Sequence, residues 1–378
     1  MDDLNQKREL VGVGIIGVQP GRSWAAKAHI PALRAMPDIF RIVGIANTTL
    51  ASAKAAASEL SLPKAFSNAD ELIACPDVDI VVIAVRVPHH LALVKAAIIA
   101  GKHVYCEWPL GNGLAEAEEL AVLAHKHNVL AVVGTQARVT PVVTYLRQLV
   151  AEGYVGEVLS TTLTAHAGGW GGVIPDKKTG AYLQDKANGA TMLTIPLGHA
   201  LAAMTDVLGD VAALSAILAT RRTSARVLDT GEHVSVSAPD QVLISGTLVR
   251  GAPVSIHYRG GMPRDGKGFT WEINGTKGDL RVTAAFGHPQ MVQLSLEGVQ
   301  DDEKVFRPLP VPSAHLGQFP EDVVPGNVAR VYARMADDLR DGSKTAPCFD
   351  DAVALHKIIA AIESAAETGL RTRIDKSL

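Results

Sequence analysis

Short, nearly continuous apolar runs alternate with helical segments along the first third of the chain. These runs predict strands at 11–17, 41–46, 80–85, 103–107 and 130–134, and the segments between them predict helices at 25–36, 50–60, 90–100 and 114–127. Strands that are apolar on both faces are typical of a parallel sheet with helices on both sides. Residues 1–140 are therefore predicted to form a doubly wound α/β domain, with its ligand beyond the carboxyl ends of the strands.

From about residue 141 the pattern changes to runs in which apolar and polar residues alternate. A helix at 142–152 comes first, and two helices at 328–340 and 350–367 close the chain; the alternating runs between them are 158–166, 212–219, 233–237, 241–249, 253–259, 270–275, 279–283 and 291–296. Alternation indicates strands with one buried face, so residues 141–378 are predicted to form an α+β domain with an open, largely antiparallel sheet. The broad face of such a sheet is often used for dimerisation, and a homo-oligomer is expected. The closing helices either stay within this domain or pack back on the first.

The first predicted strand runs directly into a glycine-bearing turn and then into a helix. This order of elements binds the pyrophosphate of a dinucleotide, because glycines let the backbone approach the phosphates and the first helical turn offers free N–H groups. The regular Gly-x-Gly-x-x-Gly spacing is absent, since the second glycine is replaced and the loop is enlarged. We expect NAD or NADP to contact the residues of this loop, Gly17, Gln19, Gly21, Arg22, Ser23 and Trp24.

Composition narrows the class of protein. The chain has 378 residues, enough for two domains, and its 47% hydrophobic and 20% charged residues are typical of a globular protein. A net charge of −3 gives no electrostatic reason to expect nucleic acid or an anionic membrane as partner. No apolar stretch approaches the roughly 20 residues of a membrane span, and the polar amino terminus does not resemble a signal peptide. Three cysteines without ligand spacing predict reduced thiols and no metal site, so a cytoplasmic location is expected.

Several short motifs follow one another in a fixed order along nearly the whole chain. They are Pro88-His89-His90, Glu107-Trp108-Pro109-Leu110 at the end of the 101–110 stretch, Gly198-His199, Asn274-Gly275-Thr276-Lys277-Gly278, and the stretch 364–369. Together they resemble the glucose–fructose oxidoreductase, inositol dehydrogenase and MocA (Gfo/Idh/MocA) family of NAD(P)-dependent enzymes. The resemblance implies a Rossmann domain for the cofactor and a second domain that shapes the substrate pocket.

A narrower resemblance is to the branch of this family that includes the fungal galactose-pathway repressor. It is carried by the loop before Trp24, by Glu107-Trp108, by Gly168-Gly169-Trp170, and by Asn188-Gly189 leading to Gly198-His199. That branch uses the fold and a bound dinucleotide to sense a partner, without known turnover, so the fold alone does not decide the function.

Three functions therefore stay open. The first is an oxidoreductase that passes a hydride between nicotinamide and a sugar or polyol-like small molecule. The second is a dinucleotide-dependent regulatory or sensor protein without turnover. The third is a net non-redox elimination or hydrolysis with a tightly held NAD(P).

The family resemblance also places the catalytic groups. Active members carry Glu-Lys-Pro after the fourth strand, and here Trp108 replaces the lysine; Ile195 and Ala202 stand where aspartates usually flank the histidine. An indole N–H donates a hydrogen bond but cannot relay a proton. His199 remains as the general-base candidate, because its ordinary pKa suits proton transfer near neutral pH. The alternatives are a packed structural histidine and, for Trp108, either a ring stacked on the nicotinamide or sugar, or a hydrophobic plug.

Further residues are assigned to the cofactor by the same resemblance. These are Pro88, His90, Glu107 at the ribose or as a brace of its loop, and Arg138 near the nicotinamide, for which an interdomain salt bridge is the alternative. Asn47 and Thr48 occupy the place where an acidic residue would bind the adenosine ribose. Without a carboxylate there, NADP is permitted and NAD is not excluded.

A glycine-rich segment, 166–172, follows the first strand of the second domain. If this segment is a substrate loop, it presents His166 and Trp170 to the pocket. If it is a plain connector between elements, neither side chain contacts the substrate. Tyr182 is a further substrate candidate. Weaker candidates, for which surface solvation is the alternative, are Lys177, Lys178, Thr191 and Thr194.

Overall fold

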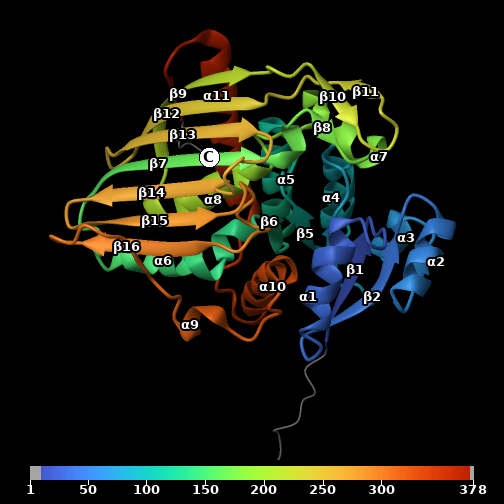
Figure 1. Ribbon diagram of the computed structural model, residues 1–378. Helices are drawn as coiled ribbons and strands as arrows, with labels where there is room; N and C mark the ends of the chain where they lie inside the picture. Colours follow the sequence, from blue (N-terminus) through green and yellow to red (C-terminus); the bar gives the residue numbers. More distant parts are fainter. Residues whose placement is uncertain (1–9, 375–378) are drawn as a thin grey trace, which may run out of the picture.

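The computed structural model describes residues 10–374. The polar stretch at residues 1–8, which argued against a signal peptide, lies outside the described residues. Two sheets dominate the molecule and lie side by side, a small one built from the blue-to-teal part of the chain and a large one built from the green-to-orange part (Figure 1). Within residues 10–374, no helix has the length and apolar character needed to cross a membrane.

The first sheet is parallel and doubly wound, as predicted. Its strand order is β3-β2-β1-β4-β5-β6, and the strands are β1 (Val11–Ile16), β2 (Phe40–Ala46), β3 (Ala65–Phe66), β4 (Ile80–Ile83), β5 (His103–Glu107) and β6 (Ala131–Gly134). The helices of this domain are α1 (Ile30–Arg34), α2 (Leu50–Glu59), α3 (Ala69–Ala74), α4 (His90–Ile99) and α5 (Leu114–His127). The strand order reverses between β1 and β4, and this switch point is where such sheets bind ligands.

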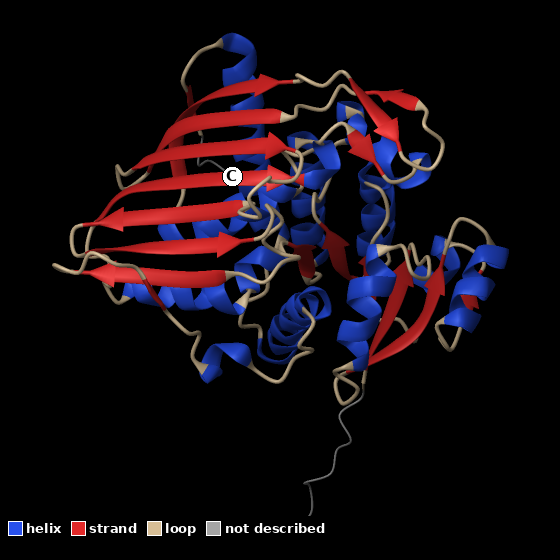
Figure 2. Cartoon of the chain, viewed as in Figure 1, coloured by secondary structure: helices blue, strands red, loops and turns tan. Residues whose placement is uncertain are grey.

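The second sheet has nine strands in the order β17-β16-β15-β14-β7-β13-β12-β9-β18. They are β7 (Val158–Ala167), β9 (Val211–Ala219), β12 (Gln241–Leu248), β13 (Pro253–Gly260), β14 (Phe269–Gly275), β15 (Gly278–Ala284), β16 (Ser295–Gln300), β17 (Arg307–Pro308) and β18 (Thr372–Arg373). Only β13 and β7 pair in parallel, so the prediction of a largely antiparallel sheet is confirmed. Helices cover one face of this sheet, and its other face carries none of the described helices (Figure 2).

Two strand predictions in this domain were wrong in detail. The strand expected at 291–296 begins only at Ser295, because residues 289–291 form a turn after Gly287 and His288. The strand expected at 233–237 is the short β11 (His233–Ser235), which belongs to a separate three-stranded sheet with β10 (Ser224–Val227) and β8 (Val173–Ile174). Alternation predicts a strand, but it does not say which sheet the strand joins.

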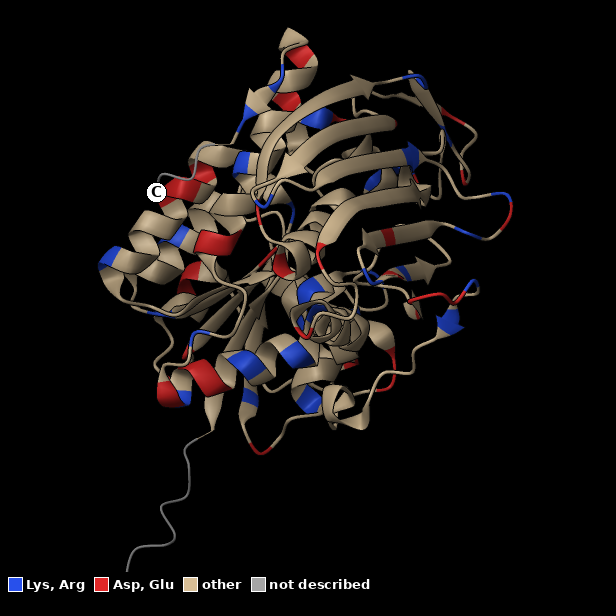
Figure 3. Ribbon diagram, turned by 90° about the vertical axis from the view of Figure 1, so that its left-hand side faces the viewer, with Lys and Arg blue, Asp and Glu red and all other residues tan. Residues whose placement is uncertain are grey.

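The helices of the second part of the chain connect the two sheets. They are α6 (Pro141–Ala151), α7 (Lys177–Gly180), α8 (Pro196–Leu208), α9 (Ser313–Leu316), α10 (Val323–Asp341) and α11 (Phe349–Thr368). α10 packs on α1, and α11 packs on both α5 and β9, so both closing helices contact the first domain. Val328, Val331, Tyr332 and Met335 of α10 share one apolar core with β1 and α1. Charged residues of both signs are dispersed over helices and loops (Figure 3).

Candidate functional site

The glycine turn lies at the switch point of the Rossmann sheet. Gly17 has a φ of 97°, and a Cβ there would lie 2.6 Å from Val85 Cγ1 and 2.7 Å from the Ala84 oxygen. Only glycine allows the chain to turn this close to the end of β4. Gly21 is also left-handed, with a φ of 66°, and no atom lies within 4 Å of the position of its Cβ. The turn is therefore tight at its start and open at its middle.

Side chains of the loop hold its enlarged shape. Ser23 Oγ accepts a 2.8 Å hydrogen bond from the backbone N–H of Gln19. The Asn47 amide pairs with the backbone of Val18, accepting from its N–H and donating to its C=O, both at 2.8 Å. Asn47 was expected at the ribose, but it braces the glycine turn instead. Thr48, beside it, is exposed.

The helix after the turn begins irregularly. Instead of one helix over 25–36, the first five residues form a π-helix, η1 (Ala25–His29), which continues into α1; π-turns are frequent at functional sites. The Trp24 Nε1–H just before it is buried and, among the described residues, has no hydrogen-bond partner. A buried unpaired donor is costly, and a ligand oxygen would satisfy it. The open glycine turn, this free donor and the positive helix end together fit a dinucleotide.

Glu107, at the end of β5, belongs to a buried network. Its Oε1 accepts from His29 Nε2 at 2.9 Å and from Gln136 Nε2 at 2.8 Å, and His29 Nδ1 lies 2.8 Å from the Tyr332 hydroxyl. The His29 side chain is fully buried and that of Glu107 is 12% exposed. Glu107 thus braces its loop by linking β5, η1 and α10. The sequence reasoning missed the other three residues, because no spacing connects residue 29 with residue 332.

Trp108 is buried between the domains. Its Nε1 donates a 2.6 Å hydrogen bond to the Thr194 carbonyl, and its ring centroid lies 4.8 Å from that of His356. The indole packs directly on Gly198, where a Cβ would lie 2.5 Å from Nε1. These contacts favour the interpretation of Trp108 as a plug, since its one donor is already occupied.

His199 lies in the first turn of α8 and is buried. Its Nδ1 has no hydrogen-bond partner among the described residues, and the same is true of His288 Nδ1. Burial, with a smaller contribution from His288, lowers the pKa of His199 from 6.5 to about 3. Burial alone lowers the pKa of His288 to about 4. At neutral pH the site therefore holds two uncharged imidazoles. The sequence reasoning missed His288, which carries no motif of its own.

The proposed substrate residues lie around this pair. The Trp170 ring stacks on that of His288, with centroids 6.2 Å apart, and its Nε1 donates to the Leu183 carbonyl at 2.9 Å. The glycine-rich segment is therefore anchored by a short helix, η4 (Gly168–Trp170). His166 lies on β7 and is half-buried, and burial lowers its pKa.

The second domain contacts the loops of the first through a short helix, η5 (Ala181–Gln184), and through the start of α7. The Tyr182 hydroxyl accepts a 2.9 Å hydrogen bond from the Val87 N–H, and the Arg86 guanidinium lies 4.9 Å from the centre of the tyrosine ring. Arg22, from the glycine loop, forms a 3.4 Å ion pair with Asp176, which caps α7. Tyr182 and Arg22 thus join the domains beside the glycine turn.

Two other residues predicted to contact the cofactor, Arg138 and His90, make structural contacts. Arg138 forms ion pairs with Asp206 (3.0 Å) and Asp351 (2.8 Å), and these carboxylates raise its pKa despite burial. Its guanidinium is committed to the interdomain bridge that was the alternative to a cofactor contact. His90 is buried, with Nδ1 2.8 Å from the Pro109 oxygen and Nε2 3.1 Å from the Val85 oxygen, so it clamps the loops after β4 and β5.

The four weaker substrate candidates, Lys177, Lys178, Thr191 and Thr194, also make contacts within the protein. Lys177 forms a 3.0 Å ion pair with Glu232, and the carbonyl of Lys178 accepts a hydrogen bond from Arg86. The Thr194 hydroxyl donates to the Gly189 carbonyl at 2.7 Å and accepts from the Thr191 N–H at 2.8 Å. Pro88 lies in a short helix, η2 (Val87–His89). Across residues 10–374, no three or more His, Cys, Asp or Glu side chains are grouped to hold a metal ion.

Known protein families match the two parts of the chain separately. Residues 11–135 match the oxidoreductase family with an NAD-binding Rossmann fold, and residues 141–284 match the C-terminal domain of Gal80p. The galactose/lactose metabolism regulatory protein GAL80 of Kluyveromyces lactis is 29% identical over 304 residues, which are 76% of this chain and 66% of that protein. The chain thus matches just under two thirds of that relative's length.

Two further similarities point to enzymes. The dehydrogenase aclE of Aspergillus oryzae is 31% identical over 282 residues, 72% of this chain and 76% of that protein. A solved structure of levoglucosan dehydrogenase in complex with NADH and L-sorbose superposes with a TM-score of 0.81 at 24% identity, over 97% of this chain and 99% of that one. At that identity the superposition shows the fold alone. The chain belongs to the Gfo/Idh/MocA oxidoreductase family, with an NAD-binding Rossmann domain followed by a C-terminal domain of the Gal80p type.

Proposed function

We propose that the protein is an NAD(P)-dependent oxidoreductase that acts on a sugar or polyol-like small molecule. The observation that carries this proposal is the pair of uncharged imidazoles of the buried His199 and the half-buried His288, each with a buried Nδ1 that has no hydrogen-bond partner among the described residues. A neutral imidazole offers one N–H donor and one acceptor, which matches the hydroxyl groups of an uncharged polyol. A charged substrate would find no counter-charge on either ring.

The glycine turn is the proposed cofactor site. Gly17 and Gly21 shape the turn, the first N–H groups of η1 would hold the phosphates, and Trp24 Nε1 would donate to a cofactor oxygen. The dinucleotide supplies the nicotinamide that accepts or gives the hydride. Thr48 is exposed at the end of β2 without a neighbouring carboxylate in sequence, so either NAD or NADP is accommodated.

His199 is the proposed proton acceptor. In the oxidation direction its neutral ring takes the proton of the substrate hydroxyl, while His288 binds a neighbouring hydroxyl and Trp170 backs the His288 ring. The expectation of an ordinary pKa was wrong: burial makes His199 a weaker base than a free imidazole, so proton transfer to it depends on the negative charge that develops on the substrate oxygen. The dehydrogenase of Aspergillus oryzae and the levoglucosan dehydrogenase complex support this class of reaction.

A second candidate is a dinucleotide-binding regulatory protein without turnover. Trp108 favours it, because this residue replaces the family lysine and its only donor is bound to Thr194. The GAL80 relative supports it as well. A variant of the first candidate, a net elimination or hydrolysis with retained NAD(P), would use the same histidines.

The experiment combines binding with turnover. NAD⁺ and NADP⁺ are titrated by calorimetry, and a panel of sugars and polyols is then followed at the nicotinamide absorbance and by NMR of the products. We expect tight binding of one cofactor and its reduction by at least one polyol. Tight binding with neither reduction nor product formation would replace the oxidoreductase by the regulatory candidate. Product formation without net reduction would indicate the non-redox variant.

A further inference from the structure

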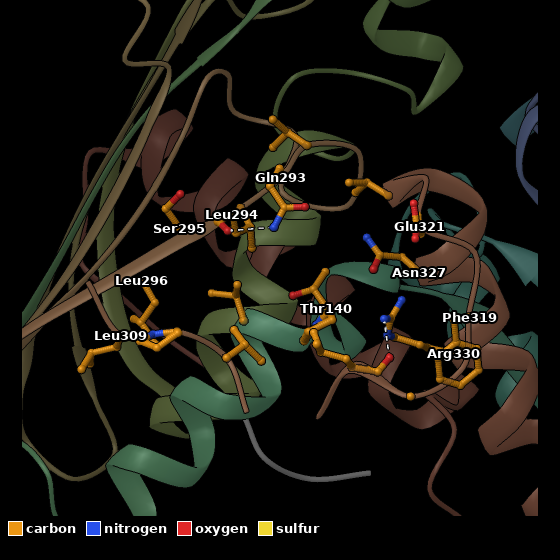
Figure 4. A pocket seen from close by; sticks show the side chains of 18 of the residues that line it. Thr140, Gln293, Leu294, Ser295, Leu296, Leu309, Phe319, Glu321, Asn327 and Arg330 are labelled. Carbon is orange, nitrogen blue, oxygen red and sulfur yellow. Dashed lines mark hydrogen bonds between the residues drawn. The ribbon is translucent and has the colours of Figure 1, made fainter. Parts of the chain in front are cut away.

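A hollow of about 740 Å³ lies between β16, the start of α6, the segment 308–323 and the start of α10 (Figure 4). This volume is in the range of sites for small molecules. It is lined by none of the residues assigned above to the cofactor, the substrate or catalysis. The hollow has no part in the proposed function, because none of its lining residues belongs to the cofactor or substrate site.

Arg330, on α10, forms the charged end of this hollow. Its Nη2 donates to the Leu316 carbonyl at 2.7 Å, and its guanidinium lies 4.8 Å from the centre of the Phe319 ring. Its Nε is buried and has no partner within residues 10–374. Glu321 lines the same hollow and is exposed, but no ion pair joins it to Arg330. Arg330 is thus a half-buried cation without an ion-pair partner among residues 10–374, and burial lowers its pKa to about 10.

A second hollow of about 600 Å³ lies on the other side of Gly317 and Phe319, and Arg330 borders both. It is also lined by Arg334, by Asp337 and by Arg147, which forms a 3.1 Å ion pair with Asp206. Burial and the nearby Arg147 lower the pKa of Arg334. The guanidinium of Arg330 is therefore in a region where a further anion would be attracted, because an uncompensated desolvated cation is costly.

The opposite wall of the first hollow is apolar. Leu294, Leu296 and Leu309 line it, and Figure 4 has Leu296 and Leu309 across the hollow from Arg330 and Asn327. Asn327 is buried, and its Nδ2 donates to the Gln290 carbonyl at 3.1 Å. The hollow thus has a polar end, formed by Arg330, Asn327 and the exposed Glu321, and a hydrophobic end. This arrangement complements a ligand with an acidic head and an apolar body.

We propose that this hollow is a second ligand site, for a small organic anion whose carboxylate or phosphate group binds Arg330 and whose apolar body packs on Leu294, Leu296 and Leu309. The site is independent of the cofactor site, so it stands whether the protein turns over a substrate or only binds a dinucleotide. Guanidinium groups bind both kinds of anion in a bidentate manner, and the experiment distinguishes them.

The test uses the fluorescent probe anilinonaphthalene sulfonate, which has a sulfonate head and an apolar body, on the full chain with saturating NAD⁺. Hexanoate and phenyl phosphate are competitors, and hexanol is the uncharged control. We expect at least one anion to displace the probe at concentrations where hexanol does not. In Arg330→Met, which keeps most of the apolar stem, we expect the affinity for that anion to fall about tenfold or more, with partial recovery in Arg330→Lys.

Arg340→Met is the matched control, because Arg340 lies on the same helix, pairs with Asp337 and Asp341, and lines neither hollow. Ser295→Phe, at an exposed lining position, should fill the hollow and weaken the binding of the probe without removing a charge. Circular dichroism and thermal unfolding establish that each variant is folded. Displacement by hexanol as strong as by the anions, or equal anion affinity in Arg330→Met and the wild type, would overturn the proposal. Failure of NAD⁺ binding would contradict only the proposed function.

Discussion

The indole N–H of Trp108 donates a 2.6 Å hydrogen bond to the carbonyl of Thr194, two residues before α8 begins. This bond joins the loop after β5 to the segment that leads into His199. In the family this loop position usually holds a lysine that acts on the substrate. Here the same position is used to fix the second domain against the first.

Trp108→Phe should therefore lower stability more than it lowers cofactor affinity. The substitution keeps most of the packing on Gly198 and His356 but leaves the Thr194 carbonyl without its donor, which costs about 1–3 kcal/mol. Urea denaturation measures the loss, and calorimetry measures the affinity for NAD(P). A loss of cofactor binding with unchanged stability would instead mean that the indole contacts the cofactor.

Trp24→Phe should have the opposite effect and lower cofactor affinity more than it lowers stability. The buried Nε1–H has no partner in the described chain, so its removal should leave the stability without cofactor unchanged or slightly higher. The affinity for NAD(P) should fall about fivefold to tenfold, since the hydrogen bond to a cofactor oxygen is lost. Unchanged affinity in Trp24→Phe would show that this indole faces no cofactor atom.

His199→Asn tests the proposed proton transfer. On the substrate identified in the turnover assay, kcat should fall about 10²–10⁴-fold while the Kd for NAD(P) stays the same. His233→Gln, at an exposed position on β11, is the control and should retain activity. Full activity of His199→Asn would remove this histidine from the mechanism and move the proton transfer to another group.

Sequence reasoning recovered the architecture because the two periodicities are strong. The four residues of β4 are all buried, which is typical of a parallel sheet covered on both faces. The residues of β13 alternate between buried and solvent-facing positions, which is typical of a sheet with one buried face. The two-residue β3 and the six-residue α3 were missed, because such short elements contain fewer than two full periods. The start of β16 was misplaced because alternation continues through the turn before it.

The site was recovered less completely, for a different reason. Family motifs identify Gly17 and His199, but they do not reveal what each side chain contacts. Asn47 bonds to Val18 and Arg138 to Asp206 and Asp351, contacts that bring together residues far apart in the sequence. His288 and Tyr332 join the site through tertiary packing alone. No local pattern around either residue could have assigned it there.

Histidines whose pKa is lowered by burial should make the fold sensitive to acid before the carboxylates titrate. Burial lowers the pKa of His199 from 6.5 to about 3, and those of His288 and His356 to about 4. Below pH 6.5 the unfolded chain therefore binds protons that the folded chain does not, so the free energy of unfolding falls as the pH falls. Above pH 6.5 these three histidines are neutral in both the folded and the unfolded state, so they add no pH dependence to the free energy of unfolding.

Each of these histidines adds up to about 1.4 kcal/mol per pH unit to that slope. Urea denaturation between neutral pH and about pH 5 should show a fall in the free energy of unfolding, and His356→Gln should reduce its slope by the equivalent of about one proton, because that variant removes one of the histidines with a lowered pKa. His233→Gln, at an exposed position, is the control and should keep the wild-type slope. An identical slope in His356→Gln and the wild type would mean that His356 is protonated in the folded protein, in contradiction to its buried place beside Trp108.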